Sequence, residues 1–427
     1  MKFTEKNIEW LVAVAVVLIS TVTFFRSLMN TLEFSVVNGF LKYFTLLILF
    51  LIYIYQKNTY GIRIFDRAYL TFYLIYCAYV FVDITILLRY PLENMSSVPK
   101  SIFDYFISFV RSIGYLLCAK TIITHFNIKK YILLSLMICT IPSVLFIHIV
   151  GVDVIQAGIA EDDEEYISTL SITYSNMPIL IFAVVYFKRL FNKRLFSIMI
   201  CSFIIASVIY ILFAYGKRGP ILWSFVGVLF CYMIRVKTIS AFFKKVIFIT
   251  IIIAALIVNI DPILDDIKDV LPKTGNRLEA TLKEGDTSGR FDLNDAKHST
   301  YLIGLDNFSR SPVWGYYFRL VTAFKDYQGT YAHNIFIEIL MTMGVLGFIP
   351  FIMFLIKAYL KSRMMINLPD FPNNMACFIL FISAFLQLQT TGSCVFYDRF
   401  WFFLYILCCL DKLGDRIPAR VKRSSIS

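Results

Sequence analysis

Two stretches of the chain carry side chains suited to moving a proton and binding an anion. The first is His333-Asn334, which stands between the long polar segment of the chain and a long apolar run. A neutral imidazole, with an ordinary pKa of ~6.5, can accept a proton from a hydroxyl group near neutral pH. The second is Gly216-Lys217-Arg218-Gly219-Pro220, where the planar guanidinium of Arg218 offers paired donors to phosphate oxygens.

Both stretches also have a plain structural interpretation. Asn334 could simply cap the helix that starts there, and Gly344 and Gly347 would then let another helix approach closely. Lys217 and Arg218 could be two interface side chains whose charged ends reach water.

A third basic candidate is Arg290, in Thr287-Ser288-Gly289-Arg290-Phe291 of the polar segment. One loop arginine is unremarkable by itself. By composition, three others in the segment are equally eligible: Arg277, Arg310 and Arg319.

The composition indicates which elements must position these residues. Of 427 residues, 59% are hydrophobic and 16% are charged, whereas soluble domains have about 25% charged residues. The chain is therefore predicted to be an all-α, polytopic membrane protein. Its net charge of +12 lies in the connections between apolar runs, so we expect no nucleic-acid partner. The nine cysteines show no metal or redox spacing, so we read them as small core residues.

Apolar runs long enough to span a bilayer predict about twelve transmembrane helices. They are Glu9–Phe25, Val36–Tyr55, Tyr69–Leu88, Ile102–Ile123, Tyr131–Val150, Leu170–Phe187, Leu195–Tyr215, Pro220–Ile234, Val246–Ile260, Asn334–Ile356, Met375–Thr391 and Val395–Leu410.

Lys and Arg gather in alternate connections, and such residues accumulate on the cytoplasmic side. This pattern predicts that both termini are cytoplasmic and that residues 261–332 form one large periplasmic loop. Within it, Ile303–Phe308 and Val313–Phe324 are apolar enough to order two or three short helices. We expect a single transmembrane domain, 1–427, that ends in a basic cytoplasmic tail, 411–427. Lys217 and Arg218 would then lie outside, against the charge rule.

With these features together, the chain resembles the O-antigen polymerase and O-antigen ligase family of membrane glycosyltransferases. The family's order of parts is present, with one long external loop before a His-Asn helix. The motifs that carry the resemblance are Gly-Lys-Arg-Gly-Pro at 216–220, Ser-Gly-Arg at 288–290, Ser-Pro-Val-Trp-Gly at 311–315, His-Asn at 333–334, and Gly344 with Gly347.

The resemblance implies transfer of a glycan from a polyprenyl diphosphate carrier to a sugar hydroxyl, at the outer face of the inner (cytoplasmic) membrane. It makes His333 the base, with His298 as the competing external histidine, and assigns the diphosphate to Arg218 and Arg290. Further substrate-binding candidates are Lys217, Arg277 and Asn334. Arginine can stabilise a leaving diphosphate without a metal, so we expect neither metal nor cofactor.

The activity predicted from this resemblance is that of a polymerase joining undecaprenyl-diphosphate-linked oligosaccharide repeat units. One alternative is a ligase that attaches finished polymer to lipid A–core. Another is a flippase for the lipid-linked oligosaccharide, although the chain lacks the half-to-half repeat of many transporters. Expected partners are the lipid-linked oligosaccharide, membrane lipid, and a chain-length regulator and flippase of the same pathway.

Overall fold

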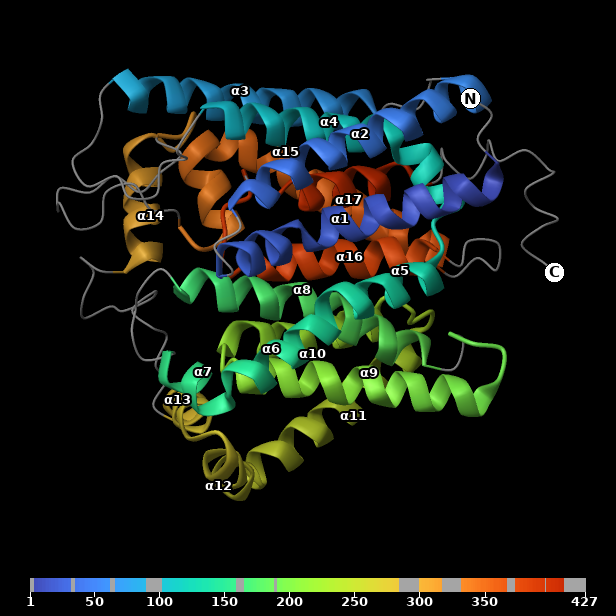
Figure 1. Cartoon of the computed structure of the whole chain (residues 1–427). Coiled ribbons are helices and arrows are strands. Elements are labelled where there is room, and N and C mark those ends of the chain that lie inside the picture. The colour runs from blue at the N-terminus through green and yellow to red at the C-terminus, as the bar shows by residue number, and fades with distance from the viewer. Residues whose placement is uncertain are drawn as a thin grey trace. The chain divides into compact units, whose positions relative to one another are not determined.

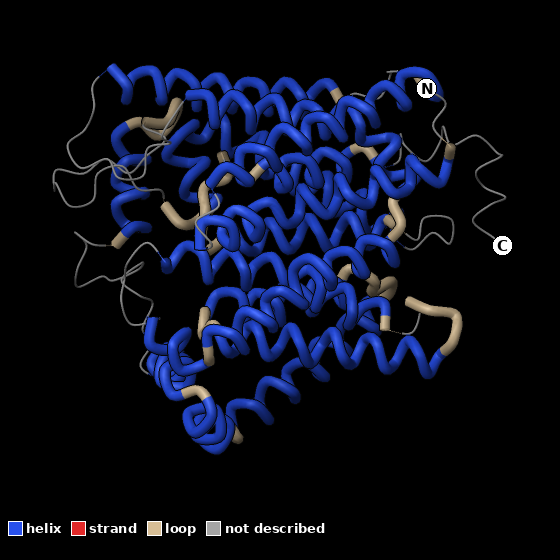
Figure 2. The backbone as a smooth tube through the Cα atoms, viewed as in Figure 1, coloured by secondary structure: helices blue, strands red, loops and turns tan. Residues whose placement is uncertain are grey.

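The computed structural model describes residues 4–31, 35–61, 66–89, 102–158, 165–187, 190–283, 299–316, 332–366, 373–395 and 397–410. Within these ranges the chain is helical and contains no strand (Figure 2). The predicted all-α class is confirmed. By its internal contacts the chain divides into two compact units, which are described separately.

The first unit comprises Met1–Phe44, His125–Asp286 and Phe378–Ser383. Its helices are α1 (Glu5–Thr31), the start of α2 (Ser35–Tyr60), α5 (Ile128–Ser135), the π-helical turn η1 (Leu136–Thr140), α6 (Ile141–Val150), α7 (Val152–Gly158), α8 (Glu165–Tyr186), α9 (Arg194–Ala214), α10 (Arg218–Met233), α11 (Ile239–Val258), α12 (Ile260–Val270), α13 (Pro272–Lys283) and the middle of α16 (Asn374–Gln387).

The second unit comprises Thr45–Thr124, Thr287–Cys377 and Ala384–Ser427. Its helices are the rest of α2, α3 (Arg67–Arg89), α4 (Ile102–His125), α14 (Thr300–Arg310), α15 (Ile335–Ile366), both ends of α16, and α17 (Asp398–Cys408).

Each of the predicted apolar runs overlaps a helix, and α5, η1 and α6 together form the fifth run. Seven helices of the described residues are long and apolar enough to cross a membrane, and three shorter helices are also apolar. These findings establish a multi-pass membrane protein. The exact number of spans and their orientation stay predictions.

The first unit is built around α8, which contacts α1 on one side and α9 and α10 on the other (Figure 1). Helix α8 lies in the interior of this unit, where its Ile181 and Phe182 are fully buried. Polar contacts add to this packing. Thr140 of η1 donates to Asn176 of α8 at 2.9 Å, where both side chains are buried.

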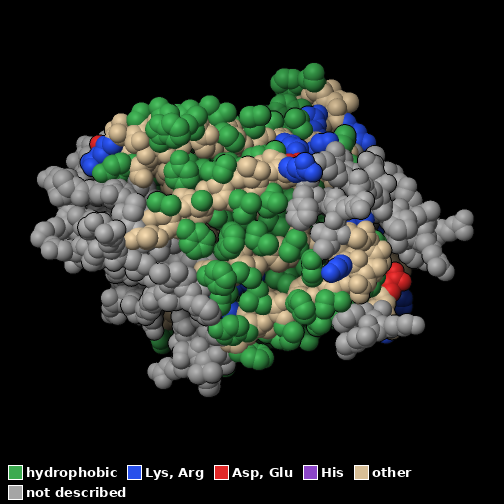
Figure 3. Space-filling model, turned by 90° about the horizontal axis from the view of Figure 1, so that it is seen from above, with side chains coloured by type: hydrophobic (Ala, Val, Ile, Leu, Met, Phe, Trp, Pro, Cys, Tyr) green, Lys and Arg blue, Asp and Glu red, His purple; other side chains and the backbone are tan. Residues whose placement is uncertain are grey.

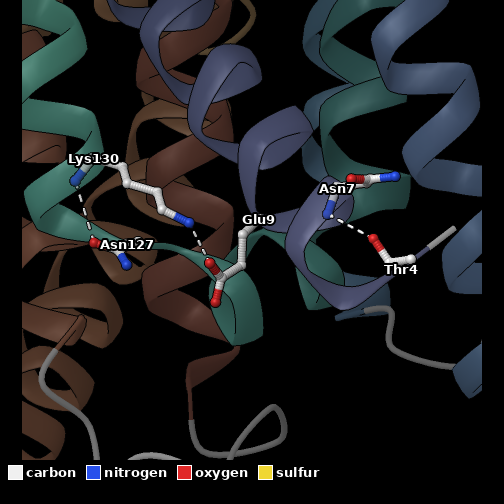
Figure 4. A network of polar contacts seen from close by, with 5 residues as sticks. All are labelled: Thr4, Asn7, Glu9, Asn127 and Lys130. Atoms are coloured by element: carbon white, nitrogen blue, oxygen red, sulfur yellow. Dashed lines mark hydrogen bonds and ion pairs between the residues drawn. The ribbon is translucent and has the colours of Figure 1, made fainter.

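A second polar network joins the beginnings of α1 and α5 in the first unit (Figure 4). The Nζ of Lys130 forms an ion pair with Glu9 and lies 5.1 Å from the centre of the Trp10 ring. Asn127 caps α5, since its side-chain oxygen accepts a hydrogen bond from the Lys130 backbone N–H at 3.2 Å. The lysine is thus held by α1 through its side chain and by the cap through its backbone.

The second unit has an aromatic core around Trp401 of α17. The ring of Trp401 is 2% exposed and lies 4.9 Å from the Tyr76 ring of α3, with Phe351 of α15 at 6.3 Å. All residues of α17 are buried. Helix α17 is therefore an interior element of its unit, which accounts for its mixture of aromatic and polar side chains.

Large apolar side chains are exposed along α9 and α11, among them Leu195, Met199, Phe203, Phe248 and Ile251. Figure 3 shows one face of the molecule, on which hydrophobic side chains far outnumber charged ones. A surface of this kind suits contact with lipid, which cannot solvate charged groups.

Candidate functional site

Asn334 caps α15, as its plain structural interpretation predicted. Its side-chain oxygen accepts hydrogen bonds from the backbone N–H groups of Phe336, at 3.0 Å, and Ile337, at 3.3 Å. Its amide nitrogen donates to the side-chain oxygen of Gln389 at 3.3 Å. Both ends of the amide are therefore engaged in fixing the start of the helix.

His333 precedes this cap in a left-handed backbone conformation, with φ of 52°. Among the described residues it is the one non-glycine residue with a positive φ. Such a conformation costs about 1–3 kcal/mol and persists where the surrounding structure imposes it, often at functional sites. The side chain is partly exposed, while the preceding Ala332 is fully buried. The structure thus places His333 at the entrance of α15, with its backbone in a defined turn.

The connection between α16 and α17, residues 388–397, holds the same corner in place. Its Leu388 carbonyl accepts from the Ile335 N–H at 3.0 Å. The Glu338 carboxylate, 1% exposed, accepts from the Ser393 hydroxyl at 2.5 Å and from the Cys394 N–H at 3.0 Å. The first turn of α15 is therefore bonded to this connection through both backbone and side chain.

The extent of the last two helices differs from the prediction. Helix α16 ends at Gln387, before Thr391, and α17 begins at Asp398, after Val395. The described residues between them, 388–395 and 397, do not continue a helix, and Gly392 has a φ of 80°. This non-helical backbone is tolerated in a membrane protein because it is bonded to α15.

Helix α15 is broken at Gly344, where φ is 61° and ψ is −163°. The segment 311–316 fills the break with its backbone. The Val345 N–H donates to the Pro312 carbonyl at 2.8 Å, and the Tyr316 N–H donates to the Met341 carbonyl at 2.6 Å. The motif Ser-Pro-Val-Trp-Gly therefore replaces helix hydrogen bonds that the break removes.

The two glycines at this contact are required by space. A Cβ on Gly344 would lie 2.3 Å from the Val313 carbonyl oxygen, and one on Gly315 would lie 2.0 Å from that of Thr342. The prediction that another helix approaches Gly344 is wrong, since the neighbour is loop backbone. For Gly347, the nearest atoms belong to Met343 of the same helix.

The second candidate group, Lys217 and Arg218, lies in the first unit at the turn between α9 and α10. Gly216 makes the turn with a φ of 56°, Lys217 is the N-cap residue, and α10 begins at Arg218. The helix thus begins two residues before Pro220, the predicted first residue of this span, and Pro220 lies in its first turn. Lys217 is 4% exposed, whereas Arg218 is partly exposed. Two cations thus stand at a helix N-terminus, whose dipole also favours anions.

Helix α13 reaches the same turn. The hydroxyl of Thr274 donates to the Phe213 carbonyl at 2.9 Å, and the Gly216 N–H donates to that same carbonyl at 3.0 Å. Arg277 lies three residues after Thr274, on the same side of α13, and is partly exposed. The structure therefore brings the segment with Arg277 to the Lys217-Arg218 turn.

Residues 203–352 match the family model described as O-antigen ligase. Over this segment the match confirms the predicted resemblance to the O-antigen ligase and polymerase family. No curated protein sequence matches the chain. The matched segment contains every candidate residue: Lys217, Arg218, Arg277, Arg290, His333 and Asn334.

The remaining candidate residues of the matched segment differ in whether the structure describes them and in the unit to which they belong. Arg290, His298 and Arg319 lie outside the described residues. Arg310 is bound within α14, where it forms an ion pair with Asp306 at 2.7 Å. The hydrogen bond to Asp306 raises the pKa of Arg310 above its usual value. His333 and Asn334 belong to the second unit, and the cations Lys217, Arg218 and Arg277 belong to the first.

Sequence reasoning missed a cluster of buried charges in the second unit, outside the O-antigen ligase segment. Arg111 of α4 forms an ion pair with Asp398 of α17, and both side chains are less than a tenth exposed. The neighbouring Arg399 donates to Gln387 and is 5% exposed. The signal was available, because Arg111 and Asp398 each interrupt an apolar run, and charges inside a membrane protein are rare and seldom incidental.

Proposed function

We propose that this protein is an O-antigen polymerase, which joins undecaprenyl-diphosphate-linked repeat units. The observation that carries the proposal is the His333 corner, a histidine held in a strained backbone conformation at the start of α15 within the family segment. The predicted topology puts this corner at the outer face of the inner membrane. For the diphosphate we propose the cations at the start of α10, which the resemblance assigns to that group.

In the proposed reaction His333 takes the proton from the acceptor hydroxyl. The resulting oxygen attacks the anomeric carbon of the donor sugar. The bond between that carbon and the phosphate oxygen breaks, and its electron pair leaves with the lipid diphosphate. Arg218 and Lys217 stabilise the departing charge. The N-terminus of α15 disfavours an added positive charge, so it helps to keep the imidazole neutral and able to accept a proton.

The test is in vitro elongation of purified lipid-linked repeat units by wild type, His333→Asn and His333→Ala. Asparagine adopts the left-handed conformation readily, so His333→Asn keeps the backbone and removes the base. We expect both variants to lose roughly 10²–10⁴-fold in rate at normal protein level. The matched control is His148→Ala, because the ring of His148 stacks on Tyr210 and has no role in the proposed reaction. Near-normal chains from His333→Asn would reduce the residue to a turn former.

His298 is the competing base and needs its own arm of this experiment. An inactive His298→Ala variant, together with an active His333→Ala variant, would assign the role of the base to His298. Activity of His298→Ala at wild-type level supports His333. Neither outcome bears on the match to the family model, because that match rests on the sequence of the chain.

The second candidate function is ligation of finished polymer to lipid A–core. The description of the matching family favours it, since that family is named for the ligase. Deletion of the gene separates the two activities by the glycans that accumulate. Loss of a polymerase leaves one repeat unit on the lipid core, whereas loss of a ligase leaves polymer on the carrier lipid. We expect the first result, together with dependence on a chain-length regulator and flippase of the same pathway.

A further inference from the structure

Helix α14 has one buried face, and that face is partly polar. Thr300, Ile303, Gly304 and Asn307 are buried at helical spacing. Leu305, Asp306, Ser309 and Arg310 are exposed on the other side. An apolar face is what packing alone would require here, so the two polar residues call for a separate explanation.

Asn307 is fully buried, yet its amide has no hydrogen-bond partner among the described residues. Neither its Nδ2 nor its Oδ1 has a partner in the part of the chain that the structure describes, and the same holds for the Thr300 hydroxyl. Buried amides elsewhere in this unit are paired, since Gln56 bonds to the Thr121 backbone and Asn374 to the Met365 carbonyl. An unpaired buried amide is costly, and its retention points to a second use.

The buried face of α14 lies against the His333 corner. Ile303, one helical turn before Asn307, packs in a cluster with Met341 and with Ala332, the residue that precedes His333. The Tyr301 hydroxyl donates to the Gln389 carbonyl at 3.2 Å, and Gln389 in turn accepts from Asn334. A molecule seated under α14 would therefore lie beside the proposed base.

The chemistry of this face fits a neutral sugar. An amide offers one donor and one acceptor side by side, and each sugar hydroxyl can both donate and accept. Asn307 can thus bind two neighbouring hydroxyl groups, with the Thr300 hydroxyl two helical turns away as a further partner. A diphosphate would need cations, and the one cation of α14, Arg310, lies on its exposed face. The acceptor, whose hydroxyl must reach the base, is the substrate that this position suits.

We propose that Asn307 binds the terminal sugar of the acceptor glycan, which α14 admits by moving away from the start of α15. This inference rests on the proposed function. It makes Asn307 a specificity residue for the acceptor, because a buried amide rejects a sugar that leaves its donor or acceptor unpaired.

The test is Asn307→Leu, which keeps the branched shape and the number of heavy atoms of the side chain and removes the polar group. If Asn307 only packs, leucine should raise the unfolding temperature and leave the kinetics unchanged. Our proposal expects an unfolding temperature at or above that of wild type and a KM for the acceptor that rises roughly tenfold or more, since two hydrogen bonds are lost. The KM for the donor should not change.

Two matched variants complete the experiment. Ser309→Ala removes a hydroxyl from the exposed face of α14 and should leave both KM values unchanged. Asn307→Asp keeps the shape but removes the donor, so it should also raise the KM for the acceptor. A KM does not depend on the amount of active protein, so it can be read even if a variant folds poorly. An unchanged acceptor KM in Asn307→Leu would overturn the proposal.

Failure of the proposed function has a different signature. Wild type would then elongate nothing, whereas failure of this inference leaves elongation intact in all variants. Binding of a lipid-free repeat-unit oligosaccharide, followed by ligand-observed NMR, is informative in both cases. Saturation transfer to the sugar in wild type and its loss in Asn307→Leu support the site. Equal transfer in both contradicts it.

Discussion

At the scale of single residues, the structure separates the roles of His333 and Asn334, which the sequence alone could not tell apart. Asn334 is committed to hydrogen bonds that begin α15, so a cap is its established role. His333 makes the turn in a conformation that a side chain resists. A simple turn would be served better by glycine, which adopts positive φ without strain. The presence of an imidazole at this turn is therefore explained best by a role in the proposed reaction.

Arg218→Lys should not restore transfer, although the charge is kept. Lysine is a point charge and lacks the planar two-pronged contact that guanidinium makes with diphosphate oxygens. We expect elongation in vitro to fall at least ~10-fold, since tenfold corresponds to about 1.4 kcal/mol, less than one charge-assisted bond. Polymer of full length from Arg218→Lys, at wild-type protein level, would make Arg218 an interface anchor.

The ion pair of Arg111 with Asp398 makes a prediction about stability. Arg111→Met leaves a buried carboxylate without its partner and should cost about 3–5 kcal/mol. Adding Asp398→Asn removes that charge and keeps an acceptor for the Arg399 N–H, which Asp398 now binds at 2.9 Å. Thermal unfolding in detergent should show the double variant above Arg111→Met. A double variant less stable than the single one would refute this account.

At the scale of elements, the break in α15 predicts how much its glycine matters. Gly344→Ala adds a strained φ and a Cβ 2.3 Å from the Val313 carbonyl, whereas Gly61 has a φ of 65° and open space around it. Gly61→Ala should therefore cost only about 1–2 kcal/mol. Gly344→Ala should cost several times as much, and purified protein should unfold at a clearly lower temperature. Equal shifts in the two variants would show that the contact with 311–316 is dispensable.

The helices themselves were predictable, because long apolar runs need backbone bonds that only a helix supplies in lipid. The break at Gly344 was not, since the residues that stabilise it come from 311–316, a different part of the sequence. A pattern of apolar residues also could not place the ends of α16 and α17. Those ends depend on the bonds of Glu338 to Ser393 and Cys394.

Some residues of the candidate site could also be predicted from the sequence, and others could not. Residue type and spacing were enough to select His333 and Arg218, because few side chains can act as a base or a phosphate fork. The unpaired amide of Asn307 could not be found in this way. An asparagine in a polar segment is ordinary, and Asn307 is set apart only by its burial without a hydrogen-bond partner among the described residues.

At the scale of the whole molecule, the alternation of charge predicts which connections face outward. In a background without the nine native cysteines, single cysteines at Thr287 and Gly329 should react with an impermeant thiol reagent on intact cells. Cysteines at Asn192 and Arg363 should react only after permeabilisation. These last two positions are exposed in the structure, so a failure to react cannot come from burial. Reaction of Asn192 on intact cells would invert the topology.

The break in α15 has a consequence for how the chain enters the membrane during synthesis. The part of the helix before the break, 335–343, is only about 13 Å long, far short of the ~30 Å hydrocarbon core. The part after the break, 345–366, is about 33 Å long and can cross that core by itself. The segment 311–316 leaves the ribosome earlier and must wait, unbonded, for its partner in α15. We expect the kink to form only after insertion, so that maturation of the site is a late, post-insertion event.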